Sequence, residues 1–113
     1  MKIPIIVKNS RVPRWLSFVT QATAITIWPF IFTDSDRDVV IRHELIHIRQ
    51  CNELLVLGFY LIYFFDFLRA LVKHKDKILA YQMIRFEQEA YDMQDDVNYY
   101  ITRKHFAWRK YKI

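Results

Sequence analysis

The sequence predicts an α+β fold in which a small β-sheet precedes three helices. Residues 3–33 are rich in β-branched side chains, residues 54–72 are almost entirely apolar, and residues 77–99 carry an apolar stripe at helical spacing. The chain has 113 residues, of which 53% are hydrophobic and 17% aromatic, and this supplies enough apolar surface for one core. We therefore expect a single domain over residues 1–113.

Two or three short strands are expected within residues 3–33. The segments IPIIV and FVTQATAITIWPFIFT consist largely of side chains that favour an extended backbone. Asn9, Ser10 and Pro13 lie between these segments and are typical of turns. The strands that they separate would form the sheet.

A first helix is expected over residues 35–52. Ser35 or Asp36 offers a side-chain oxygen for the N-cap, and the acids of TDSDRD suit the positive end of a helix dipole. The helix would then run through VVIRHELIHIRQCN, which carries two of the four histidines of the chain.

A second helix is predicted over residues 54–72, LLVLGFYLIYFFDFLRALV, and it is apolar nearly all round. Only residues 54–65 lack charge, which is shorter than the roughly 20 residues that a membrane span requires, and Asp66 and Arg69 interrupt the rest. We therefore expect a helix buried in the core. The alternatives are docking of its apolar face on another subunit and use of the helix as a membrane anchor.

A third helix is expected over residues 77–99, because apolar side chains recur there every three or four residues along one face. These side chains are Leu79, Met83, Phe86, Ala90, Met93 and Val97. The stripe that they form would pack on the core, with acidic residues on its two flanks.

The motif HELIH, residues 43–47, places His43 and His47 four residues apart on one face of the first helix. Both imidazoles can then reach one ion, while Glu44 lies about 100 degrees round the helix, near enough to hold a water on that ion. Cys51 is the only cysteine, so a metal would be held by histidine and carboxylate side chains. The motif predicts a Zn²⁺ site.

A catalytic zinc site takes three protein ligands, so a third side chain is needed downstream. His74 and His105 are formal candidates, but the segment RFEQEAYDM on the third helix offers two carboxylates, Glu87 and Glu89. They lie about 80 degrees to either side of the apolar stripe, so the stripe by itself does not choose between them.

The side chains that flank the two carboxylates distinguish Glu87 from Glu89 as the third ligand. Glu87 shares its flank with Ala80, Ile84 and Tyr91, whereas Glu89 shares its flank with Gln82, Arg85, Asp92 and Asp96. A carboxylate on an apolar flank needs a partner to offset its desolvation, and a metal is such a partner. We expect Glu87 to be the third ligand. Glu89 is the alternative ligand, and otherwise a surface residue paired with Arg85.

HELIH followed by EQEA, residues 87–90, on a later helix resembles the gluzincin metallopeptidases, and the short chain is similar to their minimal single-domain members. HELIHIRQ and FEQEAY are also similar to segments of short zincin-like proteins of Bacteroidota and their phages. The resemblance implies a zincin-like fold, Zn²⁺ bound by His43, His47 and Glu87, and Glu44 as the general base in the hydrolysis of a peptide or protein substrate.

Around this site, an extended peptide would lie along the strand AITIWPFIF by strand addition. Gln50 shares the face of both histidines, and Gln50 and Tyr91 are expected to orient the ligands or to stabilise an oxyanion. Many gluzincins carry an Asp four residues after the ligand Glu, where this chain has Tyr91.

The net charge of +5 is a property of the C-terminal tail, residues 103–113. The tail contains Arg103, Lys104, Arg109, Lys110 and Lys112, interleaved with Phe106, Trp108 and Tyr111. We expect these aromatic side chains to pack on the domain or on a protein partner. Contact of the tail with nucleic acid or with an anionic membrane is the alternative.

The main alternative to a peptidase is a structural or interaction component of a large assembly, such as a phage particle, that retains a zincin scaffold. Its partners would bind residues 54–72 and the tail. The segment MKIPIIVKNSR has too short an apolar run for a signal peptide, so we expect a protein that stays inside the cell or in an assembled particle.

Overall fold

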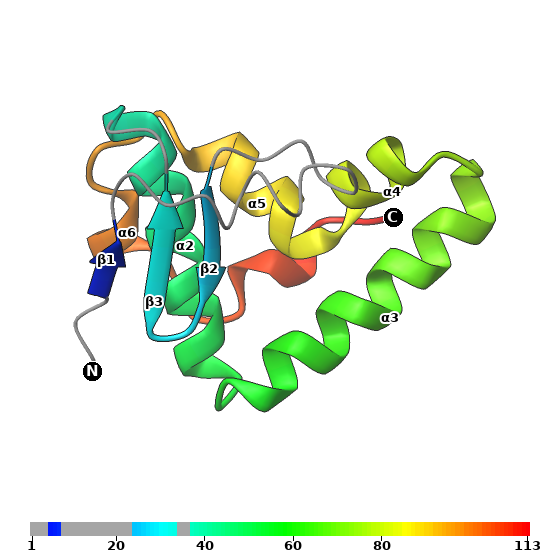
Figure 1. The fold of residues 1–113 in the computed structure, drawn as a ribbon, viewed down its shortest axis with the longest axis horizontal. Helices are drawn as coiled ribbons and strands as arrows, with labels where there is room; N and C mark the ends of the chain where they lie inside the picture. The colour runs from blue at the N-terminus through cyan, green and yellow to red at the C-terminus, as the bar shows by residue number, and fades with distance from the viewer. Residues whose placement is uncertain (1–4, 8–23, 34–36) are drawn as a thin grey trace.

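The computed structural model describes residues 5–7, 24–33 and 37–113 (Figure 1). A three-stranded sheet is followed by several helices, so the predicted α+β class is confirmed. The strands are β1 (Ile5–Val7), β2 (Ala24–Ile27) and β3 (Phe30–Thr33). The helices are α2 (Asp38–Glu53), α3 (Leu57–His74), α4 (Lys77–Met83), α5 (Arg85–Met93) and α6 (Tyr99–Thr102), with a 3₁₀ helix, η1 (Ala107–Lys110).

The sheet has the strand order β1-β3-β2. β3 runs parallel to β1, with Ile6 opposite Ile31, and antiparallel to β2, with Ile25 opposite Phe32. β2 is therefore an edge strand among the described residues. The proposed turn residues Asn9, Ser10 and Pro13 and the proposed caps Ser35 and Asp36 lie outside the described part of the chain.

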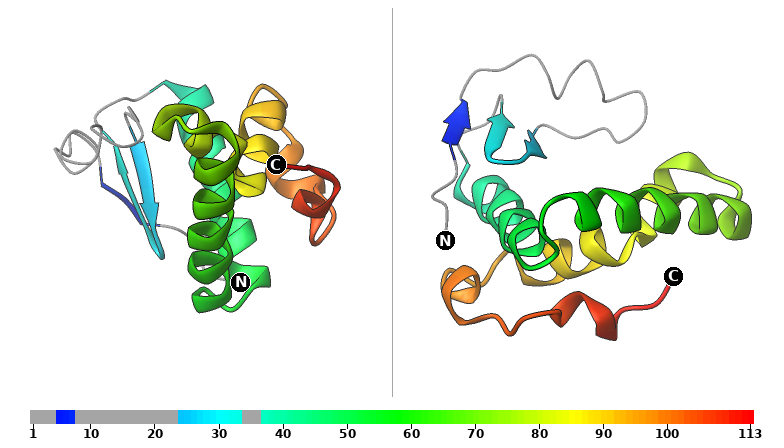
Figure 2. Two further views of the ribbon diagram at one scale, coloured as in Figure 1. Left: turned by 90° about the vertical axis from the view of Figure 1, so that its right-hand side faces the viewer. Right: turned by 90° about the horizontal axis from the view of Figure 1, so that it is seen from below.

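The elements form layers, and α2 lies in the middle of them. Figure 2 shows the sheet on one side of α2, and α5 with the C-terminal segment on the other side. α3 leaves the end of α2 at a sharp bend and projects beyond the sheet, and α4 returns along it (Figure 1). The position of α2 explains why its buried residues include the whole face that carries His43 and His47.

The helix predicted over residues 77–99 is not continuous, and this expectation was wrong. The backbone of Ile84 is extended, with φ −55° and ψ 130°, and it separates α4 from α5. Asp66 of α3, which is 1% exposed, stabilises the start of α5 at Arg85. It accepts hydrogen bonds from the backbone N–H of Arg85 at 3.2 Å and from its guanidinium at 2.9 Å. A carboxylate from another helix thus replaces the local cap that the sequence around Ile84 lacks.

The core lies where α3, α4 and α5 meet. Its buried members are Cys51, Phe59, Tyr81, Ile84, Phe86 and Trp108. Phe86 stacks on Phe59 with ring centroids 4.6 Å apart and meets Trp108 edge-on at 4.8 Å. Trp108 belongs to the basic tail, so the tail completes the core with an aromatic side chain.

The expectation that the second helix is buried holds for one face only. In α3 the buried residues are Phe59, Asp66 and Ala70, whereas leucine and phenylalanine side chains on the opposite face are exposed. No single helix in the described part of the chain is long and apolar enough to cross a membrane. α2 and α3 together reach that length and composition, but the two are bent by 114°.

Candidate metal centre

The two histidines of HELIH meet one carboxylate from another helix. His43 and His47 lie one turn apart on α2 and are 5% and 3% exposed. Glu87 enters from α5, with Oε1 at 3.0 Å from Nε2 of His43 and Oε2 at 3.1 Å from Nε2 of His47. The structure therefore brings all three sequence-predicted ligands together in the protein interior.

A glutamine fixes the orientation of His47. Oε1 of Gln50 lies 2.7 Å from Nδ1 of His47. The amide nitrogen of Gln50 donates to the carbonyl oxygen of Phe86 at 3.1 Å and to Oε1 of Glu89 at 2.9 Å. Because both of these atoms accept, the amide oxygen must face the imidazole, and Nδ1 of His47 donates its proton to that oxygen. Nε2 is then left free to bind a metal ion on the side of Glu87.

His43 has a matching partner that the sequence did not reveal. Its Nδ1 lies 2.8 Å from Oε1 of Gln94, the residue after α5. Gln94 follows Glu87 by seven residues, which is two helical turns, so the spacing places both on one side of α5. Tyr91, the predicted orienting residue, instead packs its ring edge-on against His43 at 4.4 Å, and its hydroxyl lies 3.3 Å from that of Tyr81.

The arrangement is that of a site made for a cation. Nε2 of His47 is buried without a hydrogen-bond partner, although Glu87 is close. Zinc ligands at about 2.0–2.2 Å in tetrahedral geometry stand about 3.3 Å from each other, and the separations of 3.0 and 3.1 Å are near that value. Two imidazole nitrogens and one carboxylate are also a donor set that zinc prefers. These side chains could therefore hold a metal ion.

Without a metal, protons take the place of the cation. Burial by itself would lower the pKa of His47, but the negative charge of Glu87 beside it outweighs burial and raises the pKa to about 9. Burial likewise opposes ionisation of Glu87, but the charge of His47 and the hydrogen bond from His43 hold the pKa of Glu87 well below its usual range. These side chains thus favour positive charge between them, whether protons or a metal ion supply it.

Glu44 lies beside this group and is 6% exposed. Its Oε1 accepts a hydrogen bond from the hydroxyl of Thr26 on β2 at 2.8 Å, and its Oε2 lies 3.9 Å from Nε2 of His43. The ligand atoms of His43, Glu44 and His47 all lie within 4.8 Å of one another, so these residues could hold a metal ion. Glu87 is nearer to Nε2 of His43, at 3.0 Å, than Glu44 is, at 3.9 Å.

Tyr63 of α3 is a further contact that the sequence reading missed. Its hydroxyl donates to Oε2 of Glu87 at 2.6 Å. Burial and then the charge of Glu87 raise the pKa of Tyr63 well above its usual value, so the phenol keeps its proton and remains a donor. Three helices, α2, α3 and α5, therefore position the cluster.

A cavity of about 160 Å³ opens beside the cluster. Its wall consists of residues 24–26 of β2, the aromatic side chains Phe59, Tyr60, Tyr63 and Tyr81, and the site residues Glu44, His47 and Glu87. The cavity thus joins the cluster to an edge strand on one side and to aromatic rings on the other.

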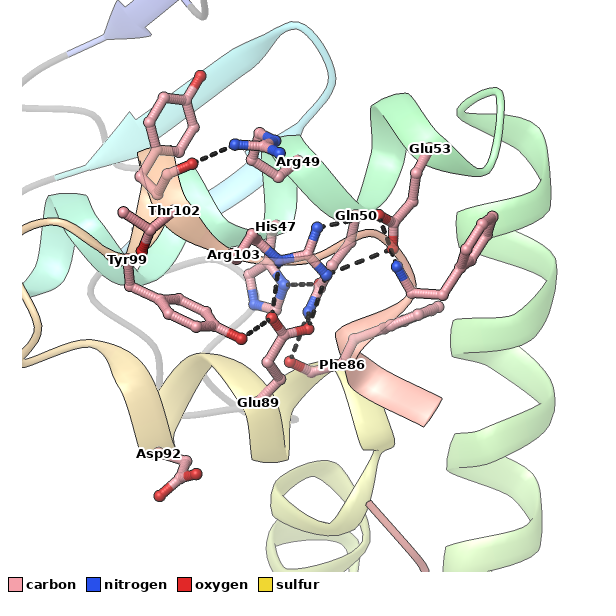
Figure 3. A network of polar contacts seen from close by, with 12 residues as sticks. His47, Arg49, Gln50, Glu53, Phe86, Glu89, Asp92, Tyr99, Thr102 and Arg103 are labelled. Atoms are coloured by element: carbon pink, nitrogen blue, oxygen red, sulfur yellow. Dashed lines mark hydrogen bonds and ion pairs between the residues drawn. The ribbon is translucent and has the colours of Figure 1, made fainter. Parts of the chain in front are cut away.

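Glu89 has a different place from the one expected. The interpretation of Glu89 as a surface residue paired with Arg85 was wrong, because Glu89 is 0% exposed and Arg85 pairs with Asp66. Figure 3 shows the carboxylate of Glu89 among other partners. It accepts hydrogen bonds from Gln50 at 2.9 Å, Tyr99 at 2.7 Å and Arg103 at 2.8 and 3.0 Å. Glu89 therefore holds Gln50, which holds His47, rather than approaching the histidines itself.

Arg103 links this network to the start of the tail. Its side chain is fully buried and binds Glu89 on one edge and Glu53 on the other, at 2.9 and 3.3 Å (Figure 3). The other histidines lie elsewhere. His74 is in the last turn of α3, and His105 follows α6 and meets the ring of Phe106.

The fold and the cluster define a small α+β protein with a buried group of histidine and glutamate side chains that could hold a metal ion. Comparisons of the chain with protein-family models, with curated proteins and with solved structures found no match. Function is therefore inferred from the cluster and from the cavity beside it.

Proposed function

We propose that this protein is a zincin-like, zinc-dependent metallopeptidase in which His43, His47 and Glu87 bind the ion and Glu44 is the general base. The observation that carries the proposal is the position of Glu87, whose two carboxylate oxygens each face one Nε2 atom at 3.0 and 3.1 Å. HELIH alone does not supply a third ligand, and a carboxylate from α5 in this position does.

When bound at such a site, zinc lowers the pKa of a coordinated water and polarises a carbonyl oxygen. Thr26 binds Oε1 of Glu44, so Oε2 is the atom available for proton transfer. In the proposed reaction, Oε2 of Glu44 accepts a proton from the attacking water and returns it to the leaving amine nitrogen. Gln50 and Gln94 keep Nδ1 of His47 and His43 protonated, so that both Nε2 atoms stay available.

The substrate proposed is an extended peptide or a protein segment. β2 pairs only with β3 among the described strands and forms one wall of the cavity, so its other edge can accept a peptide by strand addition. The aromatic wall opposite favours an apolar side chain next to the cleaved bond.

The test separates metal binding from catalysis. We expect one zinc per chain by elemental analysis, lost in His43→Ala and Glu87→Ala and retained in Glu44→Gln. We expect Glu44→Gln to abolish cleavage of a denatured protein or peptide library, and Asp95→Asn, an exposed carboxylate, to retain both properties. Absence of zinc from the wild type, even after exposure to the free ion, would refute the zinc site.

A second proposal is a structural or interaction protein of a large assembly, in which zinc only ties α2 to α5. The exposed leucine and phenylalanine side chains of α3 favour it, because a small monomer gains nothing from them. In that case Glu44→Gln would keep zinc and leave every activity unchanged. A membrane-associated peptidase is the third alternative. Contact of the tail with nucleic acid is disfavoured, because Arg103 and Trp108 are buried.

A further inference from the structure

One face of α3 is apolar along its whole length and exposed. Six side chains form it, which we call the α3 stripe: Leu57, Leu61, Phe64, Phe65, Leu68 and Val72. Phe64 and Phe65 are 55% and 59% exposed, and Val72 is 78% exposed. At 100 degrees per residue the six lie within an arc of about 100 degrees, so they form one continuous surface over the whole helix.

The opposite face holds α3 on the protein. Phe59 and Ala70 are buried in that face, and Asp66, the only acid of the helix, is buried there in its ion pair with Arg85. A helix fixed in this way presents its stripe outward and cannot be surrounded by lipid. It can only lie along a surface.

The exposed charged side chains of α3 itself are basic. Arg69 and Lys73 lie on α3, on one side of the stripe, about 40 to 100 degrees round the helix from neighbouring stripe side chains. Lys75 is the C-cap residue of α3. The side chain of Arg69 is 63% exposed, and Lys73 and Lys75 are exposed as well. The surface of α3 therefore combines apolar side chains with basic ones. Arg69 also pairs with the buried Asp66 at 3.4 Å, Lys73 also donates to the carbonyl oxygen of Ile113 at 2.8 Å, and the exposed Asp76 follows Lys75.

We propose that α3 lies in the headgroup region of an anionic membrane, with the α3 stripe at the acyl boundary and the rim cations among the lipid phosphates. Helices that bind in the plane of a membrane have this composition, with Leu and Phe on one face and Lys or Arg beside it. The proposal does not depend on a metal or on peptidase activity.

The test is co-sedimentation of the full chain with vesicles of phosphatidylcholine alone and of phosphatidylcholine with phosphatidylserine. We expect binding to the anionic vesicles that weakens about fivefold for each cation removed, in Lys73→Gln and Lys75→Gln. The triple change Leu61→Ser, Phe64→Ser and Phe65→Ser should weaken binding at least about tenfold, because three large apolar side chains no longer enter the membrane.

Matched controls are available off the stripe. Val97 and Ile101 are 66% and 76% exposed and lie outside α3, so Val97→Ser with Ile101→Ser should bind vesicles as the wild type does. All these positions are exposed, so the unfolding transition of each variant should match that of the wild type. Failure of the wild type to sediment with anionic vesicles would overturn the proposal. A wild-type dimer that the triple change dissociates, without vesicle binding, would overturn it in favour of a second copy of the chain.

Discussion

Gln50 donates to Glu89 through its amide nitrogen at 2.9 Å and accepts from His47 through its oxygen at 2.7 Å. One side chain therefore transmits the position of a buried carboxylate to a metal-binding imidazole. If the amide of Gln50 were rotated by half a turn, its nitrogen would face Nδ1 of His47, and its oxygen would face two other acceptors, the carbonyl oxygen of Phe86 and Oε1 of Glu89. The orientation of His47, with Nδ1 toward Gln50 and Nε2 toward Glu87, is consequently set by the protein before any ion binds.

The first prediction concerns Gln50. Gln50→Leu keeps the volume but removes the acceptor for Nδ1, so the dissociation constant for zinc should rise about 10- to 100-fold. Competition with a chromophoric chelator measures this change. Gln82→Leu, at an exposed position of α4, is the matched control and should bind zinc as the wild type does. Equal affinity in the two variants would show that Gln50 does not orient His47.

The second prediction concerns Arg103. Its guanidinium is fully buried between Glu89 and Glu53, so Arg103→Ala leaves two buried carboxylates without their cation. The free energy of unfolding should fall by about 3–5 kcal/mol, measured by urea denaturation. Arg109→Ala, at an exposed tail position, should change it by less than about 0.5 kcal/mol.

If the destabilisation comes from the unpaired charge, it should shrink in the double variant Glu89→Gln, Arg103→Ala. The single change Glu89→Leu should also weaken zinc binding, because Gln50 then loses one of its two acceptors. An Arg103→Ala protein as stable as Arg109→Ala would contradict the role given to this network.

The sequence predicted the sheet, the helical order and the side chains of the cluster because those depend on local periodicity. His43 and His47 are four residues apart and therefore lie on one face of any helix that contains them. Glu87 was chosen because its neighbours on its own helix are apolar. In the structure the three side chains lie together, although no spacing along the chain requires α5 to meet α2.

The break at Ile84 and the burial of Glu89 depend instead on partners far along the chain. Asp66 binds the backbone N–H of Arg85 from another helix, and Arg103 reaches Glu89 from beyond α6. A helical wheel places Glu89 among polar neighbours but cannot show that an arginine from the tail covers it. For the same reason Gln94 and Tyr63 were missed as partners of the cluster.

The third prediction concerns pH in the metal-free protein. His47 has a pKa of about 9 in the folded chain against 6.5 as its ordinary value, so its contribution to stability is complete below about pH 6.5 and is lost as the pH rises through about 9. The pKa of Glu87 is lowered in the folded chain, so the stability that Glu87 contributes is present above its ordinary pKa of 4.5 and is lost as the pH falls below that value. With chelator present, the stability that this pair supplies should be greatest between about pH 4.5 and 6.5.

Zinc should reverse this loss of stability with rising pH, because zinc binds the neutral imidazole in competition with the proton. Stabilisation by zinc should therefore grow from pH 5.5 to pH 7.5, as measured by the shift in the thermal unfolding midpoint between zinc and chelator. In His47→Ala the loss of stability toward pH 9 in chelator should be reduced. A His47→Ala profile identical to that of the wild type would rule out the pairing with Glu87 as its source.

The last prediction concerns Thr26 and rests on the proposed peptidase activity. Its hydroxyl donates to Oε1 of Glu44 at 2.8 Å, and it is the contact that ties the base to the edge strand. Thr26→Val keeps the shape but frees Glu44 to rotate, so kcat should fall about 10- to 100-fold, while the zinc content remains one per chain. Thr102→Val, an exposed position on α6, is the control and should retain full activity. A Thr26→Val protein that cleaves peptide at the wild-type rate would show that Glu44 needs no positioning from β2, and loss of its zinc would show instead that β2 supports the metal ligands.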